Sequence, residues 1–285
     1  MNDKLSKLHR LFQRVKKCDL CCTIGNGIEK RERLLRNLIA EAPVRPRYGD
    51  IPTMYTDWAS RVHAKIAIVM QDWGSARDAL KLSKHYKKKA KEECLSLDDA
   101  WRSIVQKRPK PSPTHRNIIR YLIKSAEREG LKLPSGFLDD LYFTNAVLCF
   151  RRGGASGSRN IDLETSIRNC CDGQKFLYGQ LAIVRPLIVV AAGRWALKGL
   201  GFNEGVGPTI RSVREESAYG YKEISCDGLS LCVVPTFHPA AVRNRSRKQQ
   251  ISDYQFVWKG LEHILGRDGK DLVKTCFVKG SSRQQ

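Results

Sequence analysis

The sequence predicts an α/β fold of the three-layer α/β/α kind, with a central, mostly parallel sheet of four strands. Three features of the chain lead to this prediction. Short and nearly continuous apolar runs are typical of strands that helices cover on both faces. Helical patterns lie between these runs, and strands that alternate with helices form parallel sheets. A polar residue or a glycine comes at the end of each run, where the ligand sites of parallel sheets are found.

The expected strands are four apolar runs, which take up residues 64–71, 141–149, 186–192 and 229–235. The clearest helix covers residues 114–130, where Ile118, Leu122 and Ala126 repeat at helical spacing before a glycine stop. Further helical patterns cover residues 5–15, 163–184 with a break near Gly173, 193–201 and 253–266.

Residues 1–266 are expected to form one domain, and residues 267–285 a polar C-terminal tail. Residues 76–113 interrupt the α/β pattern. They contain "HYKKKAKEE" and end in "KRPKPSPT", which indicates a charged helical insertion followed by a proline-rich loop. A second irregular segment, "RRGGASGSRN" at residues 151–160, reads as a basic glycine loop.

The charge of the chain indicates a polyanionic partner. Lys and Arg total 51 and Asp and Glu total 29, which gives a formal charge of +22. Basic side chains that neutralise phosphates release counterions, which favours nucleic acid over a merely solvated basic surface. No apolar run approaches the ~18 residues of a membrane span, and the N-terminal residues lack the apolar core of a secretory signal. We therefore expect a monomer without a membrane partner, in the cytoplasm and associated with the nucleoid.

Polar side chains stand at three of the expected strand ends. Asp72 follows the first run, Asn145 lies in the second, and His238 follows the fourth, while Gly193 follows the third. Because parallel strands end at the same edge of a sheet, we expect a carboxylate, an amide and an imidazole at one rim. Taken alone, Asp72 is better explained as a helix N-cap or an Asx turn, which is common after a strand.

Four segments carry a resemblance to a known family: "VMQDWG" at 69–74, "TNAVLC" at 144–149, "LAIVRPLIVVAAGRWA" at 181–196 and "PTFHPAAVRNR" at 235–245. Together they resemble the uracil-DNA glycosylase superfamily over most of residues 16–265, with residues 76–113 unmatched. The third segment is similar to the iron–sulfur branch, including its Arg-Pro lead-in, whereas the Gln-Asp pair resembles the classical branch. The implied fold is the three-layer α/β/α sandwich predicted above.

The resemblance implies a role for each strand-end residue. Asp72 would polarise the attacking water and face the cationic sugar. The Gln71 backbone would lie against the uracil edge, and the Asn145 amide would pair with uracil O4 and N3–H. His238 would donate to uracil O2 and stabilise the departing anion. Gly74 stands where the best-known motif has a tyrosine that screens out thymine, so thymine exclusion is left open.

The resemblance also implies DNA contacts. The expected wedge and phosphate clamp are Val242, Arg243 and Arg245, and Ser75 and Thr236 add hydrogen bonds to phosphate. The base-stacking aromatic is Trp73, Phe150 or Tyr48. The arginines of the glycine loop, Arg151 and Arg152, are expected at DNA phosphates as well.

The ten cysteines suggest a metal or cluster site, since a cytoplasmic chain keeps its thiols reduced. Cys18 and Cys21 have C-x₂-C spacing, and Cys149 and Cys170 complete a set that resembles the ligands of the iron–sulfur glycosylases. Four thiolates hold a [4Fe–4S] cluster or, equally on spacing alone, Zn²⁺. Cys22 and Cys171 are the alternative members of their doublets.

The sequence thus predicts a monofunctional DNA glycosylase, a hydrolase that flips uracil out of DNA, excises it in base excision repair and leaves an abasic site. Two alternatives stand beside it. One is a non-catalytic, iron–sulfur nucleic-acid-binding protein of the same fold. The other is a glycosylase for a different base, such as hypoxanthine or mispaired thymine.

Overall fold

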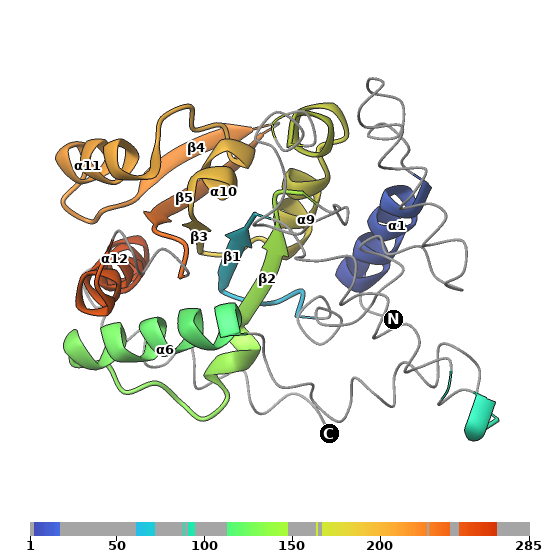
Figure 1. The fold of residues 1–285 in the computed structure, drawn as a ribbon, viewed down its shortest axis with the longest axis horizontal. Coiled ribbons are helices and arrows are strands. Elements are labelled where there is room, and N and C mark those ends of the chain that lie inside the picture. The colour runs from blue at the N-terminus through green and yellow to red at the C-terminus, as the bar shows by residue number, and fades with distance from the viewer. Residues whose placement is uncertain are drawn as a thin grey trace. The chain divides into compact units, whose positions relative to one another are not determined.

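The computed structural model describes residues 3–17, 61–71, 88, 91–94, 113–147, 164, 167–226, 228–239 and 245–266 (Figure 1). The chain divides into two compact units. The described residues of the first unit are 3–17, 71, 88, 91–94, 145–147, 164 and 167–183. Those of the second unit are 61–70, 113–144, 184–226, 228–239 and 245–266.

The second unit is built on a sheet of five strands in the order β2-β1-β3-β5-β4 (Figure 1). The strands are β1 Ile66–Met70, β2 Leu141–Asn145, β3 Ile188–Ala192, β4 Lys222–Cys226 and β5 Leu229–Thr236. β1 pairs with β3 and β3 pairs with β5 in parallel, while β4 pairs with β5 antiparallel. Every residue of β1, β2 and β3 is buried, as expected of strands covered on both faces. The predicted α/β class with a mostly parallel sheet is confirmed.

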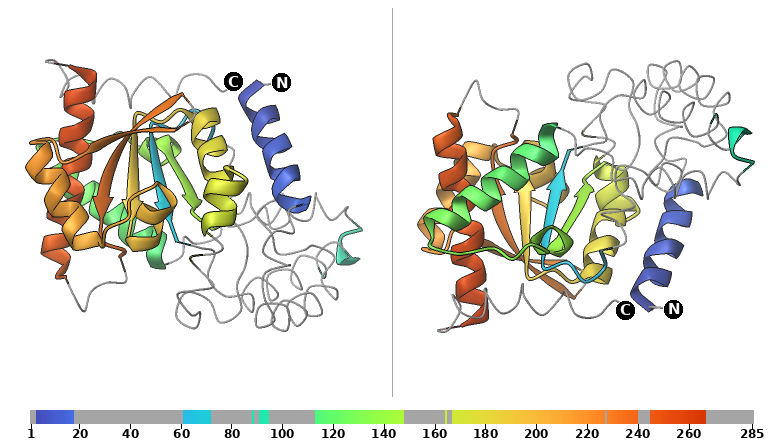
Figure 2. Two further views of the ribbon diagram at one scale, coloured as in Figure 1. Left: turned by 90° about the horizontal axis from the view of Figure 1, so that it is seen from above. Right: turned by 90° about the horizontal axis from the view of Figure 1, so that it is seen from below.

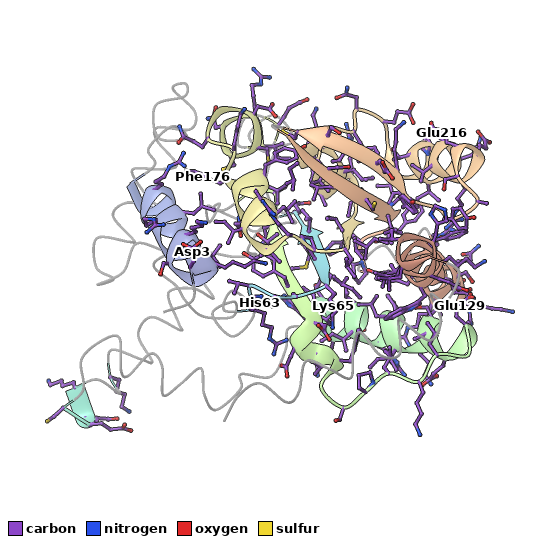
Figure 3. All side chains as sticks on the ribbon, turned by 180° about the vertical axis from the view of Figure 1, so that it is seen from behind. Asp3, His63, Lys65, Glu129, Phe176 and Glu216 are labelled. Carbon is purple, nitrogen blue, oxygen red and sulfur yellow. The ribbon has the colours of Figure 1, made fainter. Side chains whose placement is uncertain are left out.

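Strands β1 and β2 also run in the same direction. Before the two strands, Lys65 N donates to Asp140 O at 3.1 Å, and Lys65 Nζ lies 2.9 Å from Asp140 Oδ1 (Figure 3). After them, Val147 N donates to Gln71 O at 3.0 Å. Since the entries and the exits of the strands are both bonded, the strands are parallel.

The fifth strand corrects the predicted count of four. β4 lies at the sheet edge, and Lys222, Glu223 and Ser225 of this strand are exposed. An edge strand with a solvent-exposed face has no continuous apolar run, so the pattern that predicted the other strands did not predict β4.

Helices cover both faces of the sheet (Figure 2). They are α6 Pro113–Arg128, α10 Arg194–Gly199, α11 Val206–Glu216 and α12 Arg247–Leu265, with a 3₁₀ turn η2 at Phe137–Asp140. On one face α12 packs on β3, β5 and α6, and Trp258 Nε1 donates to Leu122 O at 3.1 Å and to Ser125 Oγ at 2.8 Å. On the opposite face α10 covers β1 and β3, and α11 packs on β5. These contacts make the three predicted layers.

The first unit joins the N-terminal helix to the helical region before β3. Its elements are α1 Asp3–Lys17, a π-helix η3 at Arg168–Gly173, and most of α9 Phe176–Val184. A Cβ added at Gly179 would lie 3.2 Å from Leu11 Cδ1, and Arg14 Cζ lies 5.7 Å from the Phe176 ring centroid (Figure 3). The predicted break near Gly173 is confirmed, since η3 ends there and Lys175 has a φ of 52°.

His115 gives the second unit a pH-dependent stability. Its ring lies in the first turn of α6, 4% exposed, with its centroid 4.6 Å from that of Phe143. Burial lowers the pKa of His115 from 6.5 to about 4, because the charged imidazolium is poorly solvated there. Between these values the unfolded chain binds the proton and the folded chain does not, so stability is lost as the pH falls.

We expect the free energy of unfolding to fall by roughly 3 kcal/mol between pH 6.5 and pH 4 through His115 alone. In His115→Phe this component disappears, whereas His63→Gln, at an exposed position, keeps it. Urea unfolding at a series of pH values measures the difference. Equal pH slopes for wild type and His115→Phe would contradict the account.

Candidate functional site

The carboxyl ends of three parallel strands lie at one edge of the sheet in the second unit. Met70, Ala192 and Thr236 are the last residues of β1, β3 and β5, and Ala192 pairs with Thr236. Gly193 N donates to Thr236 O at 2.8 Å, which continues this pairing past the end of β3. The residues that follow these strands therefore start from a common rim.

Gly193 allows His238 to lie against the end of β3. Gly193 has a φ of 94°, and a Cβ at this position would lie 3.0 Å from His238 Cβ. Any side chain would meet both backbone strain and this contact, so only glycine fits without a shift. His238 is half-buried here, at the rim where the sequence predicted it. Gly193 as its support was not predicted, since only the two segments together reveal the contact.

Asn145 carries an unsatisfied amide in the first unit. The residue is 0% exposed, and neither Nδ2 nor Oδ1 has a hydrogen-bond partner in the part of the chain that the structure describes. Leaving such a buried group unpaired costs about 1–3 kcal/mol, which a ligand with matching polar atoms would remove. The hydrogen bond from Val147 N to Gln71 O sets the residue after β1 beside the segment that follows Asn145. This unit thus brings together two of the residues predicted to bind the base.

The π-helix η3 presents the second cysteine doublet, and π-helical turns are frequent at functional sites. Cys171 Sγ donates to Ala146 O at 3.3 Å, next to Asn145. Burial, together with the negative charge of Asp172, raises the pKa of Cys171 to about 12. Cys170 is also buried, at 2% exposed. The described residues contain no group of three or more metal-ligating side chains.

Two predicted phosphate contacts have other partners. Thr236 is 0% exposed and donates to Ala191 O at 3.4 Å, so burial corrects the expectation that it reaches phosphate. Arg245 Nε donates to Asp253 Oδ2 at 2.7 Å, and 24% of the Arg245 side chain is exposed. The sequence held no signal for this ion pair, because Asp253 is one carboxylate among the many along the chain.

The remaining predicted site residues lie outside the described residues. They are Asp72, Trp73, Ser75, Arg151, Arg152, Val242, Arg243, Cys18, Cys21 and Cys149. Their roles stay predictions.

A surface pocket of about 510 Å³ lies elsewhere in the second unit. Tyr219 stacks on His263 there with ring centroids 3.7 Å apart, and Tyr221 Oη lies 2.9 Å from His263 Nδ1. None of the predicted site residues lines this pocket. Among the helices that the structure describes, none is long and apolar enough to cross a membrane.

Residues 110–262 match the family model of the uracil DNA glycosylase superfamily. The match covers more than half of the 285 residues and includes Asn145 and His238, whereas Gln71 and Asp72 precede it. No curated protein matches the chain.

The contact between Gly193 and His238 is tested by a pair of glycine variants. Gly193→Ala is expected to lower the free energy of unfolding by about 2–5 kcal/mol, through backbone strain plus the contact with His238. Gly228→Ala, at a φ of 76° with nothing within 4 Å of the added Cβ, isolates the strain. It should cost about 1–2 kcal/mol in the same urea titration. Equal losses of unfolding free energy in the two variants would show that the contact with His238 adds nothing to the cost of a side chain at position 193.

Proposed function

Because the chain belongs to the uracil DNA glycosylase superfamily, we propose that it flips uracil out of DNA and hydrolyses the N-glycosidic bond, leaving an abasic site. Family membership gives the coarser activity, that of a DNA glycosylase, and uracil is our proposal for the base. The observation that carries it is the buried amide of Asn145, whose two polar atoms lack a partner among the described residues.

An amide held in one orientation distinguishes uracil from cytosine. Asn145 Oδ1 would accept uracil N3–H, and Nδ2 would donate to uracil O4. Cytosine has an unprotonated N3, which accepts hydrogen bonds, and an amine, which donates them. With cytosine, Asn145 Oδ1 would therefore face an acceptor and Nδ2 would face a donor. Each unpaired buried group costs about 1–3 kcal/mol, which is enough to reject the wrong base by about tenfold or more.

His238 and Asp72 are proposed to stabilise the two charges of the transition state. Bond breaking leaves negative charge on the uracil, and a hydrogen bond from His238 to O2 would stabilise it. The support for this role is the position of His238 at the carboxyl end of β5, against Gly193. The family resemblance assigns Asp72 to the water and to the cationic sugar.

The formal charge of +22 supports a DNA substrate. The proposed contacts are Ser75, Arg151, Arg152, Val242 and Arg243, with Trp73 as a base-stacking residue. A DNA substrate fits a monomer that acts at the nucleoid.

We propose a [4Fe–4S] cluster on Cys18, Cys21, Cys149 and Cys170, as in the iron–sulfur branch of the family. Of these ligands the structure describes only Cys170, and the hydrogen bond of Cys171 to Ala146 favours Cys170 as the ligand of its doublet. The cluster would tie the N-terminal segment to the glycine loop and take no redox part in the reaction. Zn²⁺ is the alternative for the same four thiolates.

A second candidate function is a glycosylase for another base. Gly74 stands where a tyrosine would screen out the thymine methyl group, which favours thymine mispaired with guanine as an additional substrate. The matched residues 110–262 leave Asp72 out, so a non-catalytic DNA-binding protein is the third outcome that the assay below separates.

The proposed activity is tested with oligonucleotides that carry a single uracil, hypoxanthine or mispaired thymine, followed by alkaline cleavage. We expect uracil release, slowed by about 10²–10⁴-fold in Asp72→Asn and by about 10²–10³-fold in His238→Ala. Asn145→Ala should lose about 10–100-fold. Asn203→Ala, at an exposed asparagine, is the matched control and should be unchanged. No release from any oligonucleotide would refute the enzymatic function.

The cluster is tested by iron content and colour. Wild type should be brown and contain about four iron atoms per chain. Cys170→Ala should lose the iron, whereas Cys171→Ala should keep it, because the Cys171 thiol donates to the Ala146 carbonyl. A colourless protein that contains zinc would show that the four thiolates bind Zn²⁺ and not a cluster. Loss of iron in Cys171→Ala but not in Cys170→Ala would identify Cys171 as the ligand.

A further inference from the structure

The two ends of the chain segment that connects β5 to α12 are in contact. Phe237 comes directly before His238, and Arg245 comes directly before Ser246, the N-cap residue of α12. Arg245 Cζ lies 4.9 Å from the centroid of the Phe237 ring. This contact restricts the residues next to it, which include His238. We call the pair Phe237 and Arg245 the loop neck.

Arg245 is fixed to α12 by its side chain and its backbone. Nε donates to Asp253 Oδ2 and Nη2 donates to Asp253 Oδ1, both at 2.7 Å, which is the bidentate arrangement that Arg and carboxylate favour. The Arg245 carbonyl accepts a hydrogen bond from Gln250 Nε2 at 3.4 Å. The neck is therefore anchored at two points on the first two turns of α12.

Asp253 is a buried carboxylate that needs these partners. Its side chain is 0% exposed, and it accepts a third hydrogen bond, from Arg214 Nη2 of α11 at 2.7 Å. Arg214 in turn lies over the Phe256 ring, with Cζ 4.2 Å from the ring centroid. Removing one partner of a buried, hydrogen-bonded charge is strongly destabilising, so the carboxylate binds the loop neck, α11 and α12 together.

The geometry points to Arg245 as a positioning residue, which closes the loop neck and thereby holds His238 in place. The inference rests on the proposed function for the catalytic role of His238. Gly193 bounds His238 on the side of β3, and the neck fixes the chain on either side of the loop. A guanidinium with two N–H groups on a buried carboxylate and one face on a ring is arranged as an anchor, in contrast to the phosphate contact that the resemblance implies.

The inference is tested with Arg245→Lys and Arg245→Gln, and with Arg211→Gln, an exposed arginine of α11, as the control. Lysine keeps the charge but cannot form the bidentate hydrogen bonds with Asp253 or place a planar group over the Phe237 ring. A positioning role requires both Arg245 variants to lose about 10–100-fold in single-turnover kcat, with the Kd for DNA within about twofold of wild type. Wild-type kcat in Arg245→Lys would overturn the inference.

Salt dependence separates an anchor from a phosphate contact. Each phosphate contact contributes about 0.9 to the slope of log Kd against log salt concentration. We expect the slope for Arg245→Gln to equal that of wild type. A slope lower by about 0.9 in Arg245→Gln, with Arg211→Gln unchanged, would identify Arg245 as a DNA ligand and overturn the inference.

Hydrogen exchange of the free protein tests the neck without any reaction. In Arg245→Lys the backbone amides of residues 236–238 should exchange about tenfold faster, while those of α6 keep their wild-type rates. Unchanged exchange at residues 236–238 would overturn the inference. If wild type releases no base, the proposed function fails, and exchange and salt slope still decide whether Arg245 is an anchor.

Discussion

The parallel pairing of β3 with β5 is the constraint on which the described part of the site depends. Its register sets Ala192 opposite Thr236, so the next residues of both strands meet at the rim. Gly193 then lies against His238, where an added Cβ would be only 3.0 Å from His238 Cβ. β3 is buried on both faces, so a slip of one residue would move each of its side chains to the opposite layer and disrupt the packing there. The packing of the hydrophobic core thus fixes the register of β3 with β5, and this register determines the position of His238.

The sequence predicted the parts of the fold that depend on local patterns. Continuous apolar runs identified β1, β2, β3 and β5, because strands buried on both faces have no polar side to alternate with. The same logic predicted polar residues at the strand ends, and the structure finds His238 at such an end and a buried amide at Asn145. Residues 114–130 and 253–266 likewise contain most of α6 and α12.

The parts that were missed depend on pairs far apart in the chain. β4 has no apolar run, since only its pairing with β5 makes it a strand. The ion pair of Arg214 with Asp253 joins residues 39 apart, and no spacing rule reveals it. The hydrogen bond of the Cys171 thiol to the Ala146 carbonyl likewise joins residues 25 apart. A basic residue in a DNA-facing motif resembles a phosphate ligand until its acidic partner is known.

The central claim is that the buried amide of Asn145 pairs with the edge of an extruded uracil. A crystal structure of the protein with uracil bound tests it most directly. The account predicts a single uracil whose O4 and N3–H pair with the Asn145 amide. Uracil bound away from Asn145, for example in the pocket of Tyr219 and His263, would contradict it.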